Sequence, residues 1–391
     1  MVVPTLDLRD PRTQTDRYGL IEEVRAQNSY ARTPDGAVVF LNQAEVIEVL
    51  ACKDFRFTFN LIDDSKSPYL AKAIQHELLN MHGQAHGRLS RLVKIALRDR
   101  VLEGMQAQVD EIVDLLVSEL PAQTEFCADF ADPLPARILG PMFGVPYQDT
   151  EGLNEWIQIG GRKVDALQSG VDIERVEDAN RKIHDFLRDL LAERRRNLGD
   201  DLFSELIQAE IGGDRMNDDE LVYLAAELAS AGVDTTRTQL PLILLALLEH
   251  PDQMAKLRDD PKLALRAVDE GMRFAPLPWA LPHAAVHDGT FNGIEFKQGD
   301  LAFVLVPAAN RDPSVVETPN VFDITRSRVR NFAFGGGMHA CPGAQLARME
   351  MASALRVLVE RCRSITLAKP PEWEEGNVGR TLKRLHLEIH N

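Results

Sequence analysis

A single cysteine in a glycine-rich turn is the part of this sequence best suited to chemistry. Residues 331–351 read NFAFGGGMHACPGAQLARMEM, so Cys341 follows three consecutive glycines and precedes a segment with helical spacing. Glycines permit positive φ angles and close approach of the backbone. A helix N-terminus offers free N–H groups and partial positive charge, which favour a thiolate over a thiol. A thiolate held in such a loop is either a nucleophile or a metal ligand.

The nucleophile interpretation requires a base, and His339 is two residues away. Residues two apart in a tight loop normally point in different directions, and no oxyanion arrangement is evident, although a cysteine hydrolase remains open. The metal interpretation requires one axial thiolate and a flat cofactor packed against the loop, which Phe334 and the glycines suit. Many cysteines are simply small buried hydrophobes, but the surroundings of Cys341 do not favour that interpretation.

Composition narrows the class of protein. The 391 residues include 44 Lys and Arg against 60 Asp and Glu, a net charge of −16 that argues against nucleic acid as a partner. Four widely spaced cysteines do not suggest a disulfide framework or a zinc site. The first residues have no signal-peptide pattern, and the longest apolar run, at 240–248, is too short to span a bilayer. We therefore expect a cytoplasmic protein that does not bind membranes.

Most of the sequence has helical periodicity, for example at 109–120 and 181–196. A long helix should begin near Asn217, where Glu220 completes a capping-box pattern, and should continue to about residue 250. Pro241 lies inside this helix and predicts a kink.

Strand patterns are few and short. They occur at 37–41, 290–296 and 301–308. We therefore predict a mainly α fold with a small β portion, organised as a single domain over residues 1–391.

The cysteine loop, read as Phe334-Gly335-x-Gly337-x-His339-x-Cys341-x-Gly343, resembles the haem-binding loop of the cytochrome P-450 family. Other segments resemble family signatures and occur in the expected order: AGVDTT at 231–236, EGMR at 270–273 and FDITRSR at 322–328. The resemblance covers essentially the whole chain. It implies a bacterial-type haem-thiolate monooxygenase with a long central helix.

The resemblance also implies roles for individual residues. Cys341 would be the axial thiolate ligand of haem b, with Asp234 relaying protons and Thr235 assisting oxygen activation. Glu270, Arg273 and Arg326 would form a structural ion network that holds the cysteine loop in place. The remaining haem contacts would come from His86, His283, Phe334, Gly335, Gly337, His339 and Gly343. In this chain Ser90 and His283 stand where many family members have arginines, so propionate binding should rely more on histidines.

The substrate pocket expected from the resemblance is apolar with aromatic walls, which suits a small apolar organic substrate. Its predicted residues are Phe59, Leu224, Leu228, Leu277, Trp279 and Leu382. Oxygen would be the second substrate, and electrons would come from an external [2Fe–2S] ferredoxin with its reductase. The cations Arg88, Arg91, Lys94, Arg98 and Arg348 form either a docking face for that partner or an ordinary solvated helix face.

Three other functions are kept open. A haem enzyme that uses peroxide directly is disfavoured, because such enzymes often lack the acid–alcohol pair found at Asp234 and Thr235. A haem sensor or carrier would bind haem without making product. A cysteine hydrolase would be colourless when purified.

Overall fold

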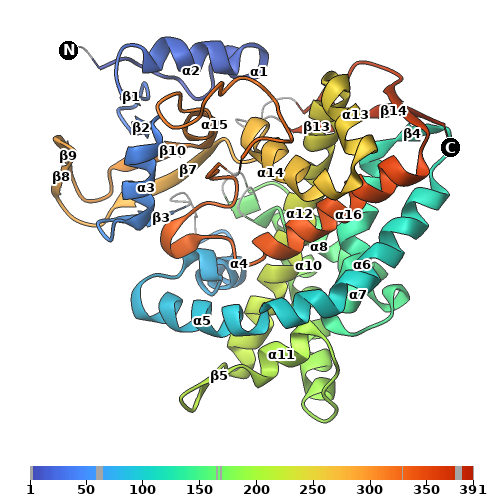
Figure 1. Cartoon of the computed structure of the whole chain (residues 1–391). Helices are drawn as coiled ribbons and strands as arrows, with labels where there is room; N and C mark the ends of the chain where they lie inside the picture. The colour runs from blue at the N-terminus through green and yellow to red at the C-terminus, as the bar shows by residue number, and fades with distance from the viewer. Residues whose placement is uncertain are drawn as a thin grey trace. The chain divides into compact units, whose positions relative to one another are not determined.

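The computed structural model describes residues 3–58, 65–163, 166–167, 170–327, 329–374 and 381–390 (Figure 1). Residues that lie close together in space group the chain into two compact units. Unit 1 consists of Met1–Thr58, Thr238–Cys341 and Cys362–Asn391, and unit 2 consists of Phe59–Arg237 and Pro342–Arg361. The prediction of a mainly α fold with a small β portion is confirmed. Among the described helices, none has the length and apolar character needed to cross a bilayer.

Unit 1 contains a five-stranded sheet whose central strand, β10, runs parallel to β2 and antiparallel to β7. In sheet order the strands are β1 (Tyr30–Arg32), β2 (Val38–Phe40), β10 (Leu301–Leu305), β7 (Ala280–Ala285) and β3 (Phe55–Phe57). One face is apolar, and Phe40 and Val304 pack there with Phe332, a residue that precedes the cysteine loop. The hydrophobic core of unit 1 therefore extends to the start of that loop.

The segment predicted as one strand at 290–296 is a hairpin instead. Strands β8 (Gly289–Phe291) and β9 (Ile294–Phe296) pair antiparallel around Asn292 and Gly293, whose φ angles are 50° and 78°. Two consecutive residues with positive φ form the turn that best matches the twist of a two-residue hairpin. The remaining pairs of unit 1 are β11 (Ser364–Leu367) with β14 (His386–His390) and β12 (Glu372–Trp373) with β13 (Leu382–Arg384).

The described part of unit 1 also contains helices and 3₁₀ turns. They are α1 (Arg12–Thr15), α2 (Arg17–Arg25), α3 (Gln43–Ala51), α13 (Pro251–Asp259), α14 (Ala264–Phe274) and α15 (Val306–Asn310), with 3₁₀ turns η3 (Pro261–Leu263) and η4 (Gly337–His339). Helix α15 begins directly after β10, so the strand predicted over 301–308 ends at Leu305. Pro307 has no N–H to donate to a sheet but is tolerated in a first helical turn, which explains the early change.

Unit 2 is mainly helical, and α10 packs on α8 while α16 packs on α6. Its helices are α4 (Pro68–Gln75), α5 (Gly83–Ala96), α6 (Asp99–Glu119), α7 (Pro133–Phe143), α8 (Tyr147–Gly160), α10 (Ile173–Arg194), α11 (Leu202–Gln208) and α16 (Ala344–Arg361). It also contains the 3₁₀ turn η1 (Leu78–Asn80), the π-turn η2 (Cys127–Ala131), and the strands β4 (Gln123–Glu125), β5 (Glu210–Ile211) and β6 (Asp214–Arg215). The helices predicted at 109–120 and 181–196 correspond to parts of α6 and α10.

The long predicted helix is α12, Asp218–Glu249, which runs from unit 2 into unit 1. Its capping box is formed as predicted. The Asn217 N–H donates to the Glu220 carboxylate at 2.9 Å, and the Glu220 N–H donates to Asn217 Oδ1 at 2.9 Å. Pro241 lies within the helix, and the kink there stays a prediction.

Candidate functional site

The cysteine loop of unit 1 is built around two glycines with left-handed backbone angles. Gly335 has a φ of 66° and Gly337 a φ of 62°. Two bonds close the loop: the Gly335 N–H donates to the Phe332 carbonyl at 2.9 Å, and the Cys341 N–H donates to the Phe334 carbonyl at 3.0 Å. The Cys341 side chain is exposed, and α16 begins three residues later at Ala344. The loop therefore presents a thiol immediately before a long helix, as the sequence predicts.

The C-terminal end of α3 forms one wall of this loop. A Cβ atom added to Gly337 would lie 1.7 Å from the carbonyl oxygen of Leu50, and one on Gly336 would lie 2.9 Å from Leu50 Cδ1. The first obstacle is backbone, so it cannot rotate out of the way as a side chain would. Gly343 differs, because a Cβ there would meet no described atom within 4 Å. The steric requirement for glycine is therefore strongest at position 337.

Two histidines with predicted haem contacts lie around one aromatic ring. The ring of Phe57 on β3 is 5.8 Å from that of His283 on β7 and 6.1 Å from that of His339 in the loop. His283 is buried, and burial lowers its pKa to about 4. Its Nδ1 is 3.1 Å from the Leu281 carbonyl oxygen. A neighbouring anion, such as a carboxylate, would favour the charged form of this imidazole.

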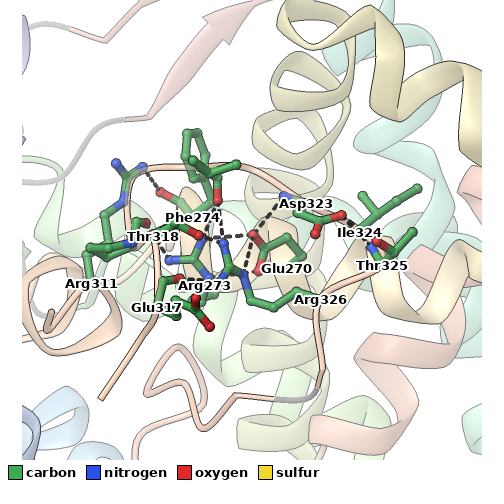
Figure 2. A network of polar contacts seen from close by, with 12 residues as sticks. Glu270, Arg273, Phe274, Arg311, Glu317, Thr318, Asp323, Ile324, Thr325 and Arg326 are labelled. Atoms are coloured by element: carbon green, nitrogen blue, oxygen red, sulfur yellow. Dashed lines mark hydrogen bonds and ion pairs between the residues drawn. The ribbon is translucent and has the colours of Figure 1, made fainter. Parts of the chain in front are cut away.

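The predicted ion network of unit 1 is assembled and buried (Figure 2). Glu270 accepts from Arg273 Nε at 2.7 Å and from Nη2 at 2.8 Å, and Arg326 Nε donates to Glu270 at 3.3 Å. Arg273 exposes 2% of its side chain and Glu270 exposes 5%. Such a network can hold neighbouring backbone rigidly, because each remaining donor is available for a carbonyl group.

The contacts of this network reach a different segment from the one expected. Arg273 donates to the carbonyls of Pro319 at 2.8 Å and Val321 at 3.0 Å. Arg326 donates to the Val321 carbonyl at 2.9 Å, and the Asp323 N–H donates to Glu270 at 3.0 Å. The network therefore directly holds residues 317–323. Its role in holding the cysteine loop stays a prediction.

In unit 2, the two residues predicted for oxygen chemistry lie on α12. The Thr235 hydroxyl donates to the Ala231 carbonyl at 2.7 Å, a common local bond in helices that leaves the hydroxyl oxygen as an acceptor. Asp234 pairs with Arg237 at 2.7 Å and exposes 53% of its side chain. Arg237 also donates to Asp132 at 3.2 Å. The carboxylate of Asp234 is thus held by a cation while remaining open to solvent.

His86, on α5 of unit 2, is 3% exposed. Burial is the largest cause that lowers its pKa, and the nearby side chains of His82 and Lys94 act in the same direction. A buried, neutral imidazole can accept or donate one hydrogen bond at each ring nitrogen. Its assignment to a haem propionate stays a prediction.

The proposed docking cations on α5, and Arg98 just before α6, are not equivalent. Arg88 forms ion pairs with Asp214 at 2.8 Å and Glu220 at 2.6 Å, and Arg98 pairs with Glu205 at 2.9 Å. Arg91 and Lys94 are exposed. The ion pairs support the solvated-face interpretation for Arg88 and Arg98, whereas Arg91 and Lys94 keep the docking interpretation open.

The predicted substrate residues lie in several environments. In unit 2, Leu224 is buried and Leu228 is half-buried; in unit 1, Leu382 is buried and Leu277 is half-buried. Trp279 is 4% exposed and packs in a hydrophobic cluster of unit 1, with the Arg17 guanidinium 4.8 Å from its ring centroid. Phe59 lies outside the described residues. The assignment of all six to a substrate pocket stays a prediction.

Sequence reasoning missed a polar cluster in unit 2. Glu227 of α12 accepts from the N–H groups of Leu78 at 2.6 Å and Leu79 at 3.1 Å. Burial and the nearby Glu77 raise the pKa of Glu227 to about 7. Glu77 is itself paired with Lys163. The available signal was a glutamate inside the apolar run LVYLAAELASAG of a helix.

A second part of this cluster involves aromatic side chains. The Tyr69 hydroxyl lies 2.6 Å from His184 Nδ1, and burial lowers the pKa of His184 to about 4. The imidazole is therefore neutral near pH 7, and one hydrogen bond joins its Nδ1 to the phenol oxygen. Tyr223 of α12 contacts His184 edge-on and stacks on His76. This part of α12, which carries the predicted pocket residues Leu224 and Leu228, thus also carries polar side chains.

Comparison with known proteins identifies the family. Residues 166–388 match the family model for Cytochrome P450. The chain is 32% identical to cytochrome P450 107B1 of Saccharopolyspora erythraea over 98% of this chain and 97% of that protein. It is 32% identical to mycinamicin IV hydroxylase/epoxidase of Micromonospora griseorubida over 93% and 92%, respectively.

Solved structures agree with these matches. The crystal structure of P450BioI in complex with hexadec-9Z-enoic acid ligated acyl carrier protein superposes with a TM-score of 0.88 at 27% identity, covering 97% of this chain and 100% of that one. The chain belongs to the cytochrome P-450 family. It is a haem-b-dependent monooxygenase, in which a cysteine thiolate is the axial ligand of the iron.

The residues of the cysteine loop fit this cofactor. The thiol of Cys341 is exposed, and the backbone around Gly337 leaves no room for a side chain on the α3 side. His283 and His339, which flank Phe57, provide ring nitrogens that suit carboxylate groups once protonated.

Proposed function

We propose that this chain hydroxylates, epoxidises or dealkylates a small apolar organic substrate, using O2 and two electrons from an external ferredoxin with its reductase. The observation that carries the proposal is the exposed thiol of Cys341 in a loop whose Gly337 lies against the Leu50 carbonyl. Haem, when bound, supplies the one-electron and O2 chemistry. We assign the axial thiolate to Cys341 and expect the protein to be cytoplasmic.

The ligand assignment is tested by the absorption spectrum of the reduced, carbon-monoxide-bound protein beside Cys341→Ser. We expect a strongly red-shifted haem band in the parent that disappears in the variant, because only the thiolate donates this much electron density to the iron. A band unaffected by the substitution would exclude Cys341 as the ligand. A colourless parent would instead favour the cysteine hydrolase.

Asp234 and Thr235 are assigned to proton delivery. The exposed carboxylate of Asp234 can exchange protons with water, and the Arg237 guanidinium keeps it oriented. The Thr235 oxygen can accept a hydrogen bond while its proton is donated to the Ala231 carbonyl. The two side chains would thus act in sequence as a proton source and a positioned hydroxyl.

An isosteric pair of variants tests this assignment. Thr235→Val should lower the product formed per electron consumed, with the excess appearing as peroxide or water. Thr236→Val is the matched control, because Thr236 is a neighbouring threonine that is 2% exposed. Equal coupling in Thr235→Val and the parent would remove Thr235 from the mechanism. Full activity with peroxide alone would favour the peroxide-using enzyme.

The substrate class is tested by titrating apolar compounds and recording the change in the haem absorption band. One relative is a mycinamicin IV hydroxylase/epoxidase, and the P450BioI structure holds an acyl carrier protein ligated with a fatty acid. Both a mycinamicin and an acyl group on its carrier protein therefore belong in the panel. Response to small apolar compounds alone supports the proposal. Response only to carrier-linked acyl groups would replace it. Binding without product under full electron supply would favour a sensor or carrier.

The electron partner is tested through the charges on α5. Arg91→Gln and Lys94→Gln should slow reduction by a ferredoxin at low salt, and high salt should abolish the difference because it screens the attraction. Arg98→Gln serves as the control, since its guanidinium is already paired with Glu205 at 2.9 Å. Equal slowing in all three variants would mean that net charge, and not a docking face, controls the rate.

A further inference from the structure

Two main-chain contacts connect the cysteine loop to other described parts of unit 1. One is Gly337, which lies against the end of α3 at Leu50. The other is Phe332, whose backbone N–H donates to the side-chain Oδ1 of Asn310 at 2.8 Å. Both Asn310 and Phe332 are 0% exposed. The second attachment therefore depends on one buried amide.

Asn310 also contacts the helix that carries the ion network. Its Nδ2 donates to the Met272 carbonyl on α14 at 3.4 Å. Its own backbone carbonyl accepts from Arg273 Nη1 at 3.3 Å. A single residue is thus bonded to the Glu270–Arg273–Arg326 network on one side and to the start of the cysteine loop on the other.

The bond to Phe332 affects the geometry of the loop because the next turns depend on it. The Phe332 carbonyl accepts from Gly335, and the Phe334 carbonyl accepts from Cys341. A buried N–H without an acceptor is energetically costly, so loss of the Asn310 oxygen would force this main chain to move toward another acceptor. Through these two bonds, such a movement would alter the turn that ends at Cys341.

We propose that Asn310 is a positioning residue that couples the buried ion network to the thiolate loop by fixing the main chain at Phe332. The inference rests on the proposed role of Cys341 as the haem ligand. It explains how a network that directly holds residues 317–323 can influence the thiolate. Gln43 supports the same arrangement, because its Nε2 donates to the Ala309 carbonyl at 3.4 Å and places α3 beside α15.

Two substitutions separate the bonds of Asn310. Asn310→Asp keeps an acceptor oxygen for the Phe332 N–H and removes the donor to Met272, whereas Asn310→Leu removes both. Gln253→Leu is the matched control. Gln253 is also a buried amide of unit 1 whose side-chain oxygen accepts a backbone N–H, that of Ile324 at 3.1 Å, a residue outside the cysteine loop.

The readout is the rate at which the reduced, carbon-monoxide-bound holoprotein loses its thiolate-type band in mild denaturant. Urea unfolding and far-ultraviolet circular dichroism are measured on the same preparations. We expect Asn310→Leu to lose the band about tenfold faster than the parent, the size of effect expected when a buried N–H is left without its acceptor. Asn310→Asp keeps the acceptor but buries a carboxyl, so it should lose the band more slowly than Asn310→Leu. Gln253→Leu should unfold more easily without this acceleration.

Two results would overturn the inference: parent-like band loss in Asn310→Leu, or equal acceleration in Gln253→Leu, which would indicate general destabilisation. If Asn310→Leu does not fold, Asn310→Ser replaces it, because its shorter side chain does not reach Phe332 and the same outcomes decide. Absence of the thiolate band in the parent is a separate result. It would reject the ligand role of Cys341 and the inference with it.

Discussion

Two glutamates of this protein are buried to nearly the same degree but differ in their hydrogen-bond partners. Glu270 on α14 is 5% exposed, and Glu350 on α16 is 4% exposed. The carboxylate of Glu270 receives bonds from two guanidinium groups and from the Asp323 N–H. Within the described residues, Glu350 Oε2 has no hydrogen-bond partner, and burial raises the pKa of this carboxyl to about 8. Partners, and not depth, decide whether a buried carboxyl carries charge.

Glu227 lies between these two cases. Two backbone N–H groups stabilise its charged form, whereas burial and the carboxylate of Glu77 oppose it, which gives a pKa of about 7. The environment of Glu270 suits a permanent structural ion pair. The environments of Glu350 and Glu227 produce carboxyl groups that change protonation state near neutral pH. The following experiments test this distinction, beginning with the largest expected effect.

Disrupting the Glu270–Arg273–Arg326 network should have the largest effect on the free energy of unfolding. Arg273→Leu leaves Glu270 partly uncompensated and removes the donors to the Pro319 and Val321 carbonyls. We expect the free energy of unfolding to fall by about 3–5 kcal/mol, as for other buried ion pairs that lose one partner. Urea unfolding monitored by fluorescence measures this. A loss below about 1 kcal/mol would be typical of a surface pair and would contradict the comparison.

Glu350→Gln should have the opposite effect and raise the free energy of unfolding near pH 8. The folded pKa of about 8 is above the ordinary value of 4.5, so the parent should lose stability as pH rises from 4.5 to about 8, because only the unfolded state ionises there. The variant should lack this decline and exceed the parent by about 2–4 kcal/mol near pH 8. Parallel stability–pH curves for the two proteins would mean that Glu350 is charged in the fold.

Glu227→Gln should give a smaller version of the same result. Its window runs from the ordinary pKa of 4.5 to about 7, where the parent should again lose stability as pH rises. The variant should lack this decline. Near pH 7 it should exceed the parent by only about 1 kcal/mol, because Gln also loses one of the two N–H bonds at every pH. Hydrogen exchange at the Leu78 and Leu79 amides locates the effect. Because Glu77 and Lys163 face the same cluster, Glu77→Gln shows how much of the shift is due to their charges.

The smallest effect is expected for an exposed ion pair. Arg98→Gln removes the 2.9 Å pair with Glu205, in which Arg98 exposes 48% of its side chain. We expect a change of about 0.2–1 kcal/mol that disappears in high salt. A salt-independent loss comparable to that of Arg273→Leu would show that exposure is a poor guide to the value of a charge in this protein.

Features set by neighbouring residues could be predicted from the sequence. The capping box at Asn217, the helix after Cys341 and the glycine turn before it depend on short-range chemistry. The hairpin at 289–296 could also be predicted from the sequence, because Asn292-Gly293 is a strong hairpin signal. The alternating apolar pattern around it favoured a single strand instead. In these cases a local pattern contains most of the information.

Contacts between distant residues could not be predicted in the same way. The bond between Asn310 and Phe332 joins α15 to a loop, and the bond between Glu227 and Leu78 joins residues 149 positions apart. Nothing in the immediate sequence of either residue indicates its partner. Their roles follow from burial, because a polar group removed from water must find a partner wherever the fold provides one.

The position of Gly337 has a consequence for altering this enzyme by random mutagenesis. The atom that would obstruct a side chain there is the main-chain oxygen of Leu50, which is present whatever amino acid occupies position 50. A second substitution at that neighbour therefore cannot restore tolerance, as it could for a clash between side chains. Libraries therefore gain nothing by varying residue 337 in any background.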